Sequence, residues 1–170
     1  MNKKTKKCKP SDYPDLWHFF PNHAPLAKRM SKLYEENDKM DDEIDMKPSG
    51  LWLSIGDAWL TFLDESGFSK SKNYNKIKAC VPRDKLIVFR NKRDALSFHK
   101  KYGVYMKFHT IIMPMINWTR VRQDYPDKVG LALAFKPHFD LKSPLFWLNS
   151  WDVPSVVLWD RSAIRSVLDK

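Results

Sequence analysis

Residues 47–63 read Lys-Pro-Ser-Gly-Leu-Trp-Leu-Ser-Ile-Gly-Asp-Ala-Trp-Leu-Thr-Phe-Leu, and the fold class follows from this stretch. Its proline and first glycine predict a turn, and the apolar run after them predicts a strand ending near Ser54. Beyond Asp57, Trp59 and Phe62 stand three positions apart, as they would on one face of an amphipathic helix. A strand, a turn and a helix therefore follow one another here, which indicates mixed α and β structure.

The chain before this stretch predicts one strand and one polar segment. Leu-Trp-His-Phe-Phe at residues 16–20 is apolar and is closed by Pro21, so we expect an extended piece that carries His18. Residues 31–46 have helix-forming composition but few apolar anchors, and they predict either a polar surface helix or a loop. Residues 1–12 contain five lysines and are expected to form a basic, flexible arm.

The chain after it predicts further strands and helices. We expect strands at 74–81 and 85–89, joined at Pro82-Arg83-Asp84 by a hairpin or a corner, and buried strands at 129–135 and 156–159. Asn91 as an N-cap and Gly103 as a stop predict a helix over 92–102, and a second helix is expected near 117–125. Asp160 is expected to cap a last helix that runs through Leu168.

Together these elements predict an α+β fold in one domain, residues 13–170. We expect one twisted, mainly antiparallel sheet, either continuous or split into two halves, with helices packed outside it. A cleft is expected between the His18 strand and the Trp52 strand. A chain of 170 residues that is 43% hydrophobic and holds seven tryptophans has enough apolar side chains for one such core.

The charge of the chain points to an anionic partner. The formal net charge is +10, and clustered lysine and arginine gain affinity for phosphates by releasing counterions. Nucleic acid is the partner we expect, while a solubilising arm and a solvated acidic face at 35–45 form the plain alternative. The candidate nucleic-acid ligands are Lys70, Lys72, Lys76, Lys78, Arg83 and Lys85.

Several classes of site and location lack their sequence signatures. Cys8 and Cys80 have no metal-ligand spacing, so we expect reduced thiols, no disulfide and no metal site. The chain shows no Walker loop, no His-Glu-x-x-His and no Gly-x-Ser-x-Gly. No apolar run is long enough for a membrane span or a signal peptide, so a cytoplasmic protein without a membrane partner is expected.

Three segments resemble the landmarks of a largely uncharacterised protein family of bacteriophages, bacteria and large viruses. They are Leu-Trp-His-Phe-Phe at 16–20, Lys-Pro-Ser-Gly-Leu-Trp-Leu-Ser at 47–54 and Trp-Asp-Val-Pro-Ser-Val-Val-Leu-Trp-Asp at 151–160. The corresponding family landmarks are His-Phe-Ser, Lys-Pro-x-Gly-Leu-Trp-x-Ser and Trp-Asp-x-Ala-Ser-Gly-x-Ile-Trp-Asp. The first two are also similar in order to the ADP-ribosyltransferase fold, which binds NAD.

This resemblance implies roles for specific residues. His18 would orient a nucleotide sugar, Trp52 would offer a ring face, and Ser54 would form a hydrogen bond near the reacting ribose. Trp151 and Trp159 would line the same aromatic site. The family acid is replaced by Ala132, and Phe20 stands where the family has serine. Asp152, followed by Asp160, is therefore the candidate for the catalytic carboxylate, although Asp160 has the alternative role of capping a helix.

Two classes of function follow from these residues. The first is an enzyme acting at an N-glycosidic bond, which either transfers ADP-ribose from NAD or excises a base from nucleic acid. The second is a catalytically degenerate module that binds nucleic acid, or a host or phage protein, in conflict between phage and host. No resident cofactor is indicated, and NAD enters only as a candidate substrate.

Overall fold

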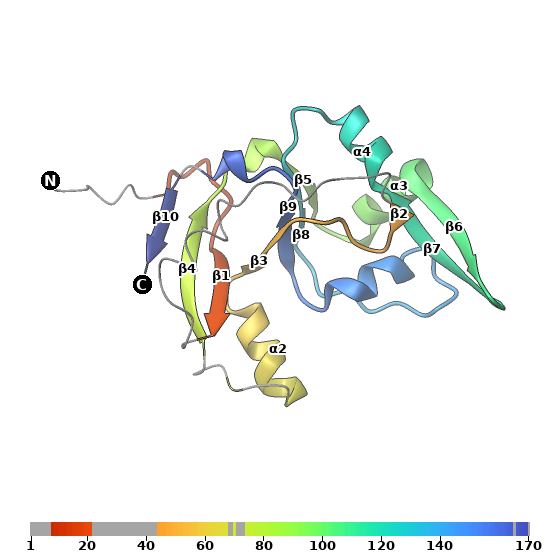
Figure 1. Cartoon of the computed structure of the whole chain (residues 1–170), viewed down its shortest axis with the longest axis horizontal. Coiled ribbons are helices and arrows are strands. Elements are labelled where there is room, and N and C mark those ends of the chain that lie inside the picture. The colour runs from red at the N-terminus through yellow and green to blue at the C-terminus, as the bar shows by residue number, and fades with distance from the viewer. Residues whose placement is uncertain (1–7, 22–43, 68–69, 71–73, 165, 170) are drawn as a thin grey trace, which may run out of the picture.

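The computed structural model describes residues 8–21, 44–67, 70, 74–164 and 166–169, and within them the protein is α+β (Figure 1). A seven-stranded sheet has the order β10-β4-β1-β3-β9-β8-β5, and a three-stranded sheet has the order β2-β7-β6. The strands are β1 Leu16–Pro21, β2 Ile44–Asp45, β3 Leu51–Ile55, β4 Tyr74–Cys80, β5 Leu86–Phe89, β6 Gly103–Phe108, β7 Ile111–Asn117, β8 Gly130–Leu133, β9 Ser155–Leu158 and β10 Ser166–Asp169. The helices are α2 Ala58–Ser66, α3 Lys92–Tyr102 and α4 Trp118–Asp124, with 3₁₀ turns η2 Arg83–Lys85, η3 Phe146–Trp151 and η4 Arg161–Ala163.

The large sheet is antiparallel except for the pair β5–β8. This confirms the predicted α+β class and the mainly antiparallel sheet. β1 pairs with β4 along its whole length, from Leu16 to Pro21, but it pairs with β3 only at Leu16↔Ile55 and Trp17↔Ser54. β1 and β3 therefore separate beyond Trp17, inside a sheet that is otherwise continuous.

Both faces of the large sheet are apolar, and each belongs to its own cluster. Val156 and Leu158 of β9 belong to one cluster, which also contains Leu53 and Ile77. Val157, between them, belongs to the second cluster, in which side chains of α3, α4 and η3 pack together. Alternation with a period of two residues places neighbours on opposite faces, and a strand buried on both faces is apolar throughout.

The two predicted helices after β5 are confirmed. The Asn91 side chain accepts hydrogen bonds from the backbone N–H groups of Arg93 (2.9 Å) and Asp94 (3.1 Å), so it caps α3. Asn117 caps α4 in the same way by accepting from the N–H of Arg120 (2.9 Å). Gly103 follows α3 directly but has a φ of −67°, because it is already the first residue of β6.

Gly50 is required by the close approach of β3 to β9. Its φ is +152°, and a Cβ atom built there would collide with the carbonyl oxygen of Leu158. Leu158 is the partner of Leu51 in the β3–β9 ladder. Any side chain at position 50 would therefore push the two central strands apart.

The predicted C-terminal helix is wrong. Asp160 does accept a hydrogen bond from the N–H of Ser162 (2.9 Å), but the turn it caps, η4, is only three residues long. The chain then extends as β10, which pairs antiparallel with β4 from Ser166↔Cys80 to Asp169↔Ile77. The N–H and C=O groups at the edge of β4 offer hydrogen-bond partners to this segment. Helix propensity depends only on the local sequence, so it does not include such a distant partner.

The predicted connection at residues 82–84 is a corner and not a hairpin. The 3₁₀ turn η2 lies there, and β4 and β5 are separated by four strands in the sheet order. The predicted helix or loop at 31–46 lies mostly outside the described residues, whose next segment starts at β2. In the part of the chain that the structure describes, no helix is long and apolar enough to cross a membrane.

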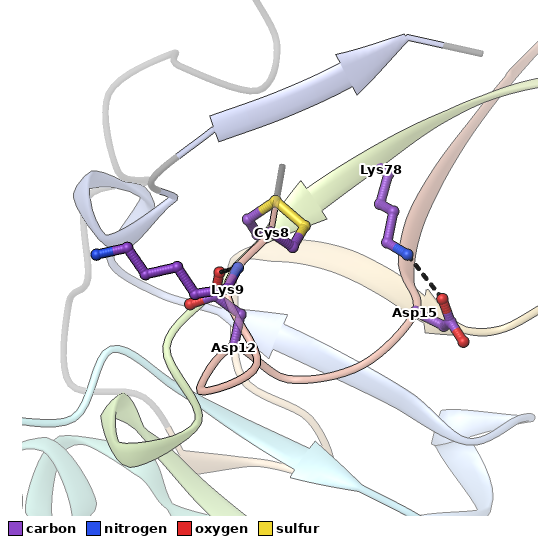
Figure 2. Close-up of a disulfide and its surroundings, with 6 residues drawn as sticks. Cys8, Lys9, Asp12, Asp15 and Lys78 are labelled. Atoms are coloured by element: carbon purple, nitrogen blue, oxygen red, sulfur yellow. Dashed lines mark hydrogen bonds and ion pairs between the residues drawn. A yellow bond between two sulfur atoms is a disulfide. The ribbon is translucent and has the colours of Figure 1, made fainter. Parts of the chain in front are cut away.

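The expectation of reduced thiols is also wrong, because Cys8 and Cys80 form a disulfide (Figure 2). The spacing of the two cysteines in the sequence did not predict this bond, since they are 72 positions apart and are brought together only by the fold. The adjoining chain is also held by backbone contacts: Tyr13 N–H donates to the Val81 carbonyl (2.7 Å), and Asp12 forms a bridge with Pro82. Residues 8–12 of the predicted arm are thus attached to the end of β4, and residues 1–7 lie outside the described part.

Candidate functional site

A cavity of about 290 Å³ opens where β1 and β3 separate. Five of the predicted site residues line it: His18 from β1, Trp52 and Ser54 from β3, Trp151 at the end of η3, and Asp152 in the turn that follows. The cavity thus gathers residues from the three segments that sequence analysis singled out. The predicted cleft between the His18 and Trp52 strands is present.

His18 bridges the gap between the two strands. Its Nδ1 lies 2.9 Å from the carbonyl oxygen of Trp52, and because a carbonyl can only accept, Nδ1 carries the proton in this contact. The ring packs edge-on against Phe20, with the centroids 4.3 Å apart. Phe20, which stands where the resembled family has serine, therefore supports the imidazole ring by packing against it.

Aromatic side chains form the walls of the cavity. Trp52 and Trp151 meet edge to face with centroids 4.7 Å apart, and Lys47 Nζ lies 5.4 Å from the Trp52 ring centroid. Lys47 Nζ also donates to the carbonyl of Ser150 (3.2 Å), which holds the lysine at the cavity wall. Trp151 is buried, and its Nε1–H has no hydrogen-bond partner among the described residues. Trp147, which lies outside the cavity lining, also has an Nε1–H without a partner among the described residues, so this feature does not by itself mark the cavity.

Ser54 has a structural use in this arrangement. Its hydroxyl donates to the carbonyl of Gly56 (3.2 Å) and accepts from the backbone N–H of Trp59 (3.1 Å). The side chain is buried and connects the end of β3 to the first turn of α2. Ser54 therefore fixes the strand-to-helix turn, and both of these hydrogen bonds engage its hydroxyl within the fold.

Asp152 occupies an unusual backbone conformation. Its φ of 56° and ψ of −49° form a γ-turn in which the Val153 N–H donates to the Trp151 carbonyl (2.5 Å). A residue other than glycine in this region is strained, and such strain concentrates at functional sites. Asp152 is exposed and also lines a second hollow of about 440 Å³, together with Lys136 and His138. The carboxylate thus stands between an aromatic cavity and a wider polar one.

Three other positions singled out in the sequence lie away from the cavity lining. Trp159 is buried and donates from Nε1 to the Lys128 carbonyl (3.0 Å), so it is a core residue. Asp160 caps η4. Ala132, where the resembled family would carry an acid, is fully buried on β8 in the cluster that holds Val156 and Leu158. A side chain at this position lies outside the cavity lining.

The candidate phosphate ligands fall into separate groups. Lys76 and Lys78 of β4 lie over the Trp17 ring, with Nζ 4.6 Å and 5.3 Å from its centroid. Each is also paired with an acid, Lys76 with Asp57 (3.0 Å) and Lys78 with Asp15 (2.7 Å). These pairs neutralise much of the local charge, so the two lysines support the Trp17 wall of the cavity. Arg83 and Lys85 are exposed and follow the C-terminal end of β4. Lys70 is exposed and precedes the N-terminal end of β4, and Lys72 lies outside the described residues.

Sequence reasoning missed eight residues of the lining, and four of these have an aromatic or charged side chain: Trp17, Phe19, Lys47 and Trp59. The signal was present for three of them, because Trp17 and Phe19 flank His18 and Lys47 opens the second landmark.

Within the described residues, Cys8, Asp12 and Cys80 form a close group of metal-ligating types, but the two sulfur atoms are bonded to each other. The group therefore acts as a covalent link.

The comparisons with known proteins add no relative to this picture. No family model, no curated protein and no solved structure matches the chain.

Proposed function

We propose that this protein is an enzyme acting at an N-glycosidic bond of a nucleic-acid-related substrate, on an ADP-ribosyltransferase-like scaffold. The observation that supports it is the convergence of His18, Trp52, Trp151 and Asp152, from three distant segments, on one cavity. The proposal takes ADP-ribose transfer from NAD and excision of a DNA base as its two reactions, since both break a bond between a sugar and a ring nitrogen.

The cavity suits one planar ring. Its volume of about 290 Å³ is at the lower end for ligand pockets, so a nucleobase or a nicotinamide fits better than a whole dinucleotide. Trp52 and Trp17 offer aromatic faces and edges to such a ring. The sugar would then lie toward Asp152, at the border with the polar hollow.

The proposed step breaks the bond between C1′ of the sugar and the ring nitrogen. The bonding electron pair leaves with the ring, and positive charge develops on the sugar. Nicotinamide departs from NAD as a neutral molecule without taking up a proton, whereas a DNA base takes up a proton as it leaves. The Asp152 carboxylate would stabilise that charge, and water or an acceptor hydroxyl would attack C1′ and lose a proton. His18, held by its Nδ1 contact with Trp52, would position the sugar.

The basic composition supports a nucleic-acid substrate in this proposal. A chain of net charge +10 attracts polyanions at long range, and such binding weakens as salt rises. A cytoplasmic location is proposed with it, although a disulfide such as Cys8–Cys80 persists mainly in oxidising compartments. A base in duplex DNA would have to leave the stack to enter the cavity, whereas a single-stranded base would enter directly.

One observation favours the second candidate, a binding module without catalysis. The Ser54 hydroxyl, which the resemblance places near the ribose, is engaged by Gly56 and Trp59. In that case the aromatic cavity would hold an extruded base, and Asp152 would have no chemical role.

The test is product analysis with matched aspartate variants. The protein is incubated with NAD plus nucleic-acid or protein acceptors, and separately with modified and unmodified DNA, and mass spectrometry detects added ADP-ribose or released base. Asp152→Asn should lower the rate by about 10²-fold or more, the scale of removing one strong transition-state stabiliser. The control, Asp160→Asn, removes a carboxylate outside the cavity lining and should retain the rate.

Two outcomes would count against the enzyme. The first is no product from any substrate while tight, salt-sensitive binding to nucleic acid persists, which would favour the binding module. The second is product formation that Asp152→Asn and His18→Ala leave unchanged in folded protein, which would place the chemistry elsewhere.

A further inference from the structure

The β6–β7 hairpin carries most of the exposed large apolar side chains. Seven such side chains are exposed among the described residues, and five of them lie on this hairpin: Tyr105, Met106, Phe108, Ile111 and Ile112. The hairpin projects from the body of the protein to a narrow tip (Figure 1). Tyr105 and Ile112 are 62% and 60% exposed, which is unusual for such large apolar groups. This concentration marks a surface that is expected to be covered.

β6 is also an edge strand. The small sheet has the order β2-β7-β6, so among the described strands β6 pairs on one side only. An open edge with apolar side chains is a template for pairing with another strand, and natural proteins usually protect it with charge or a bulge. Here the whole strand Gly103–Phe108 has a single charged residue, Lys107.

One face of the hairpin is continuously apolar. Residues opposite each other in an antiparallel pair share a face, and the β6–β7 register pairs Val104 with Met115, Met106 with Met113, and Phe108 with Ile111. Methionine adapts its shape to a partner surface, and three of these six residues are methionine. Tyr105 and Lys107 of β6 point to the other face, together with their β7 partners Pro114 and Ile112.

We propose that this edge pairs with β6 of a second copy of the chain, antiparallel, about a twofold axis at Met106. This register places Met106 opposite the partner's Met106, Val104 opposite the partner's Phe108, and Tyr105 opposite the partner's Lys107. The apolar faces of the two hairpins then join, and the lysine of each copy meets an aromatic ring. The two small sheets become one six-stranded sheet with an isologous interface.

The charge pattern selects this register and this occupant. Shifting the axis to Lys107 would place the two lysines opposite each other, and shifting it to Tyr105 would leave Phe108 beyond the end of the partner's strand. The chain has no acidic residue between Asp94 and Asp124, so in a pair of identical edges the group that meets Lys107 is the partner's Tyr105 ring and not a carboxylate. Pairing with an identical edge therefore gives each side chain from Val104 to Phe108 an apolar or aromatic neighbour, or, for Tyr105, the partner's Lys107.

The net charge adds a distinctive salt dependence. Two chains of net charge +10 repel each other at long range, and salt screens that repulsion. Salt should therefore strengthen the dimer, whereas it weakens the binding of a basic protein to nucleic acid.

The test is the oligomeric state of the full chain in sedimentation velocity, over a concentration series at low and high salt. Wild type should form a dimer that is favoured by salt. Met106→Lys places like charges at the axis and should raise the dissociation constant about tenfold or more, and Met106→Glu should do the same. An equimolar mixture of Met106→Lys and Met106→Glu should dimerise again, because opposite charges then face each other.

The matched control is Leu141→Lys, which adds the same charge at an exposed apolar residue outside the hairpin and should leave the dimer intact. A monomer at every soluble concentration would overturn the proposal, and so would a dimer that Met106→Lys does not weaken or a charge-swapped mixture that stays monomeric. Monomeric protein that binds vesicles of anionic lipid through the hairpin would also overturn it, by assigning the surface to lipid.

Discussion

At the scale of single residues, Gly50 offers a direct test of the central strand pairing. Gly50→Ala should lower the free energy of unfolding by about 3 kcal/mol, because alanine is strained at a φ of +152° and its Cβ would collide with the Leu158 carbonyl. Urea denaturation measures the change. Gly67→Ala is the control, since its φ of +71° is also left-handed but nothing lies within 4 Å of its Cβ position, so only about 1 kcal/mol should be lost. If Gly50→Ala and Gly67→Ala lower the free energy of unfolding equally, the close approach of β3 to β9 at Gly50 does not contribute to stability.

His18 and Ser54 show how far residue types alone can identify a site. The chain positions of His18, Trp52 and Asp152 predicted one cleft, and the structure brings them to one cavity. Ser54 and Trp159 matched landmarks equally well, yet one caps a turn and the other is a core residue. A motif lists residue types, whereas hydrogen-bond partners depend on where the backbone places each side chain.

At the scale of secondary structure elements, the junction of α3 and β6 contains a buried histidine that makes stability depend on pH. His99 is 5% exposed, its Nδ1 has no partner among the described residues, and burial lowers its pKa. Below the ordinary pKa of about 6.5, the unfolded chain binds a proton that the folded protein resists, so the unfolded state gains stability. The free energy of unfolding should therefore fall as the pH drops from neutral through this range.

The contribution of His99 can be isolated by comparing pH profiles. His99→Asn should give a shallower loss of melting temperature on acidification than wild type, whatever its stability at neutral pH. His138→Asn removes an exposed histidine and should leave the slope unchanged. Parallel profiles for His99→Asn and wild type would contradict the role of His99.

Elements with local signals were predictable, and elements that depend on distant partners were not. The Asn91 cap and the apolar spacing after it predicted α3 to its last residue. β10 was missed because its partner, β4, lies about ninety positions earlier in the chain. The β6–β7 hairpin was missed because its two-residue turn is His109-Thr110, with His109 at a φ of 53°, in place of the usual glycine or asparagine.

At the scale of the whole molecule, the disulfide is the largest single constraint on the unfolded chain. Cys8→Ser should lower the free energy of unfolding by about 4 kcal/mol, since the bond closes a loop of 72 residues in the denatured state. Chemical denaturation of the variant measures this loss, and wild type in reductant should show the same midpoint. If reductant and Cys8→Ser both leave the midpoint unchanged, the thiols are reduced in the working protein.

The sheet order has a consequence for synthesis on the ribosome. β4, β1 and β3 lie side by side and are made by residue 80, but their outer neighbours β9 and β10 are made only from residue 155 onward. The emerging chain can thus form a three-stranded unit whose two borders stay open until β9 and β10 have been made. During that interval the nascent protein exposes unpaired strand edges, so the rate at which residues 155–169 leave the exit tunnel would govern how much of it misassembles.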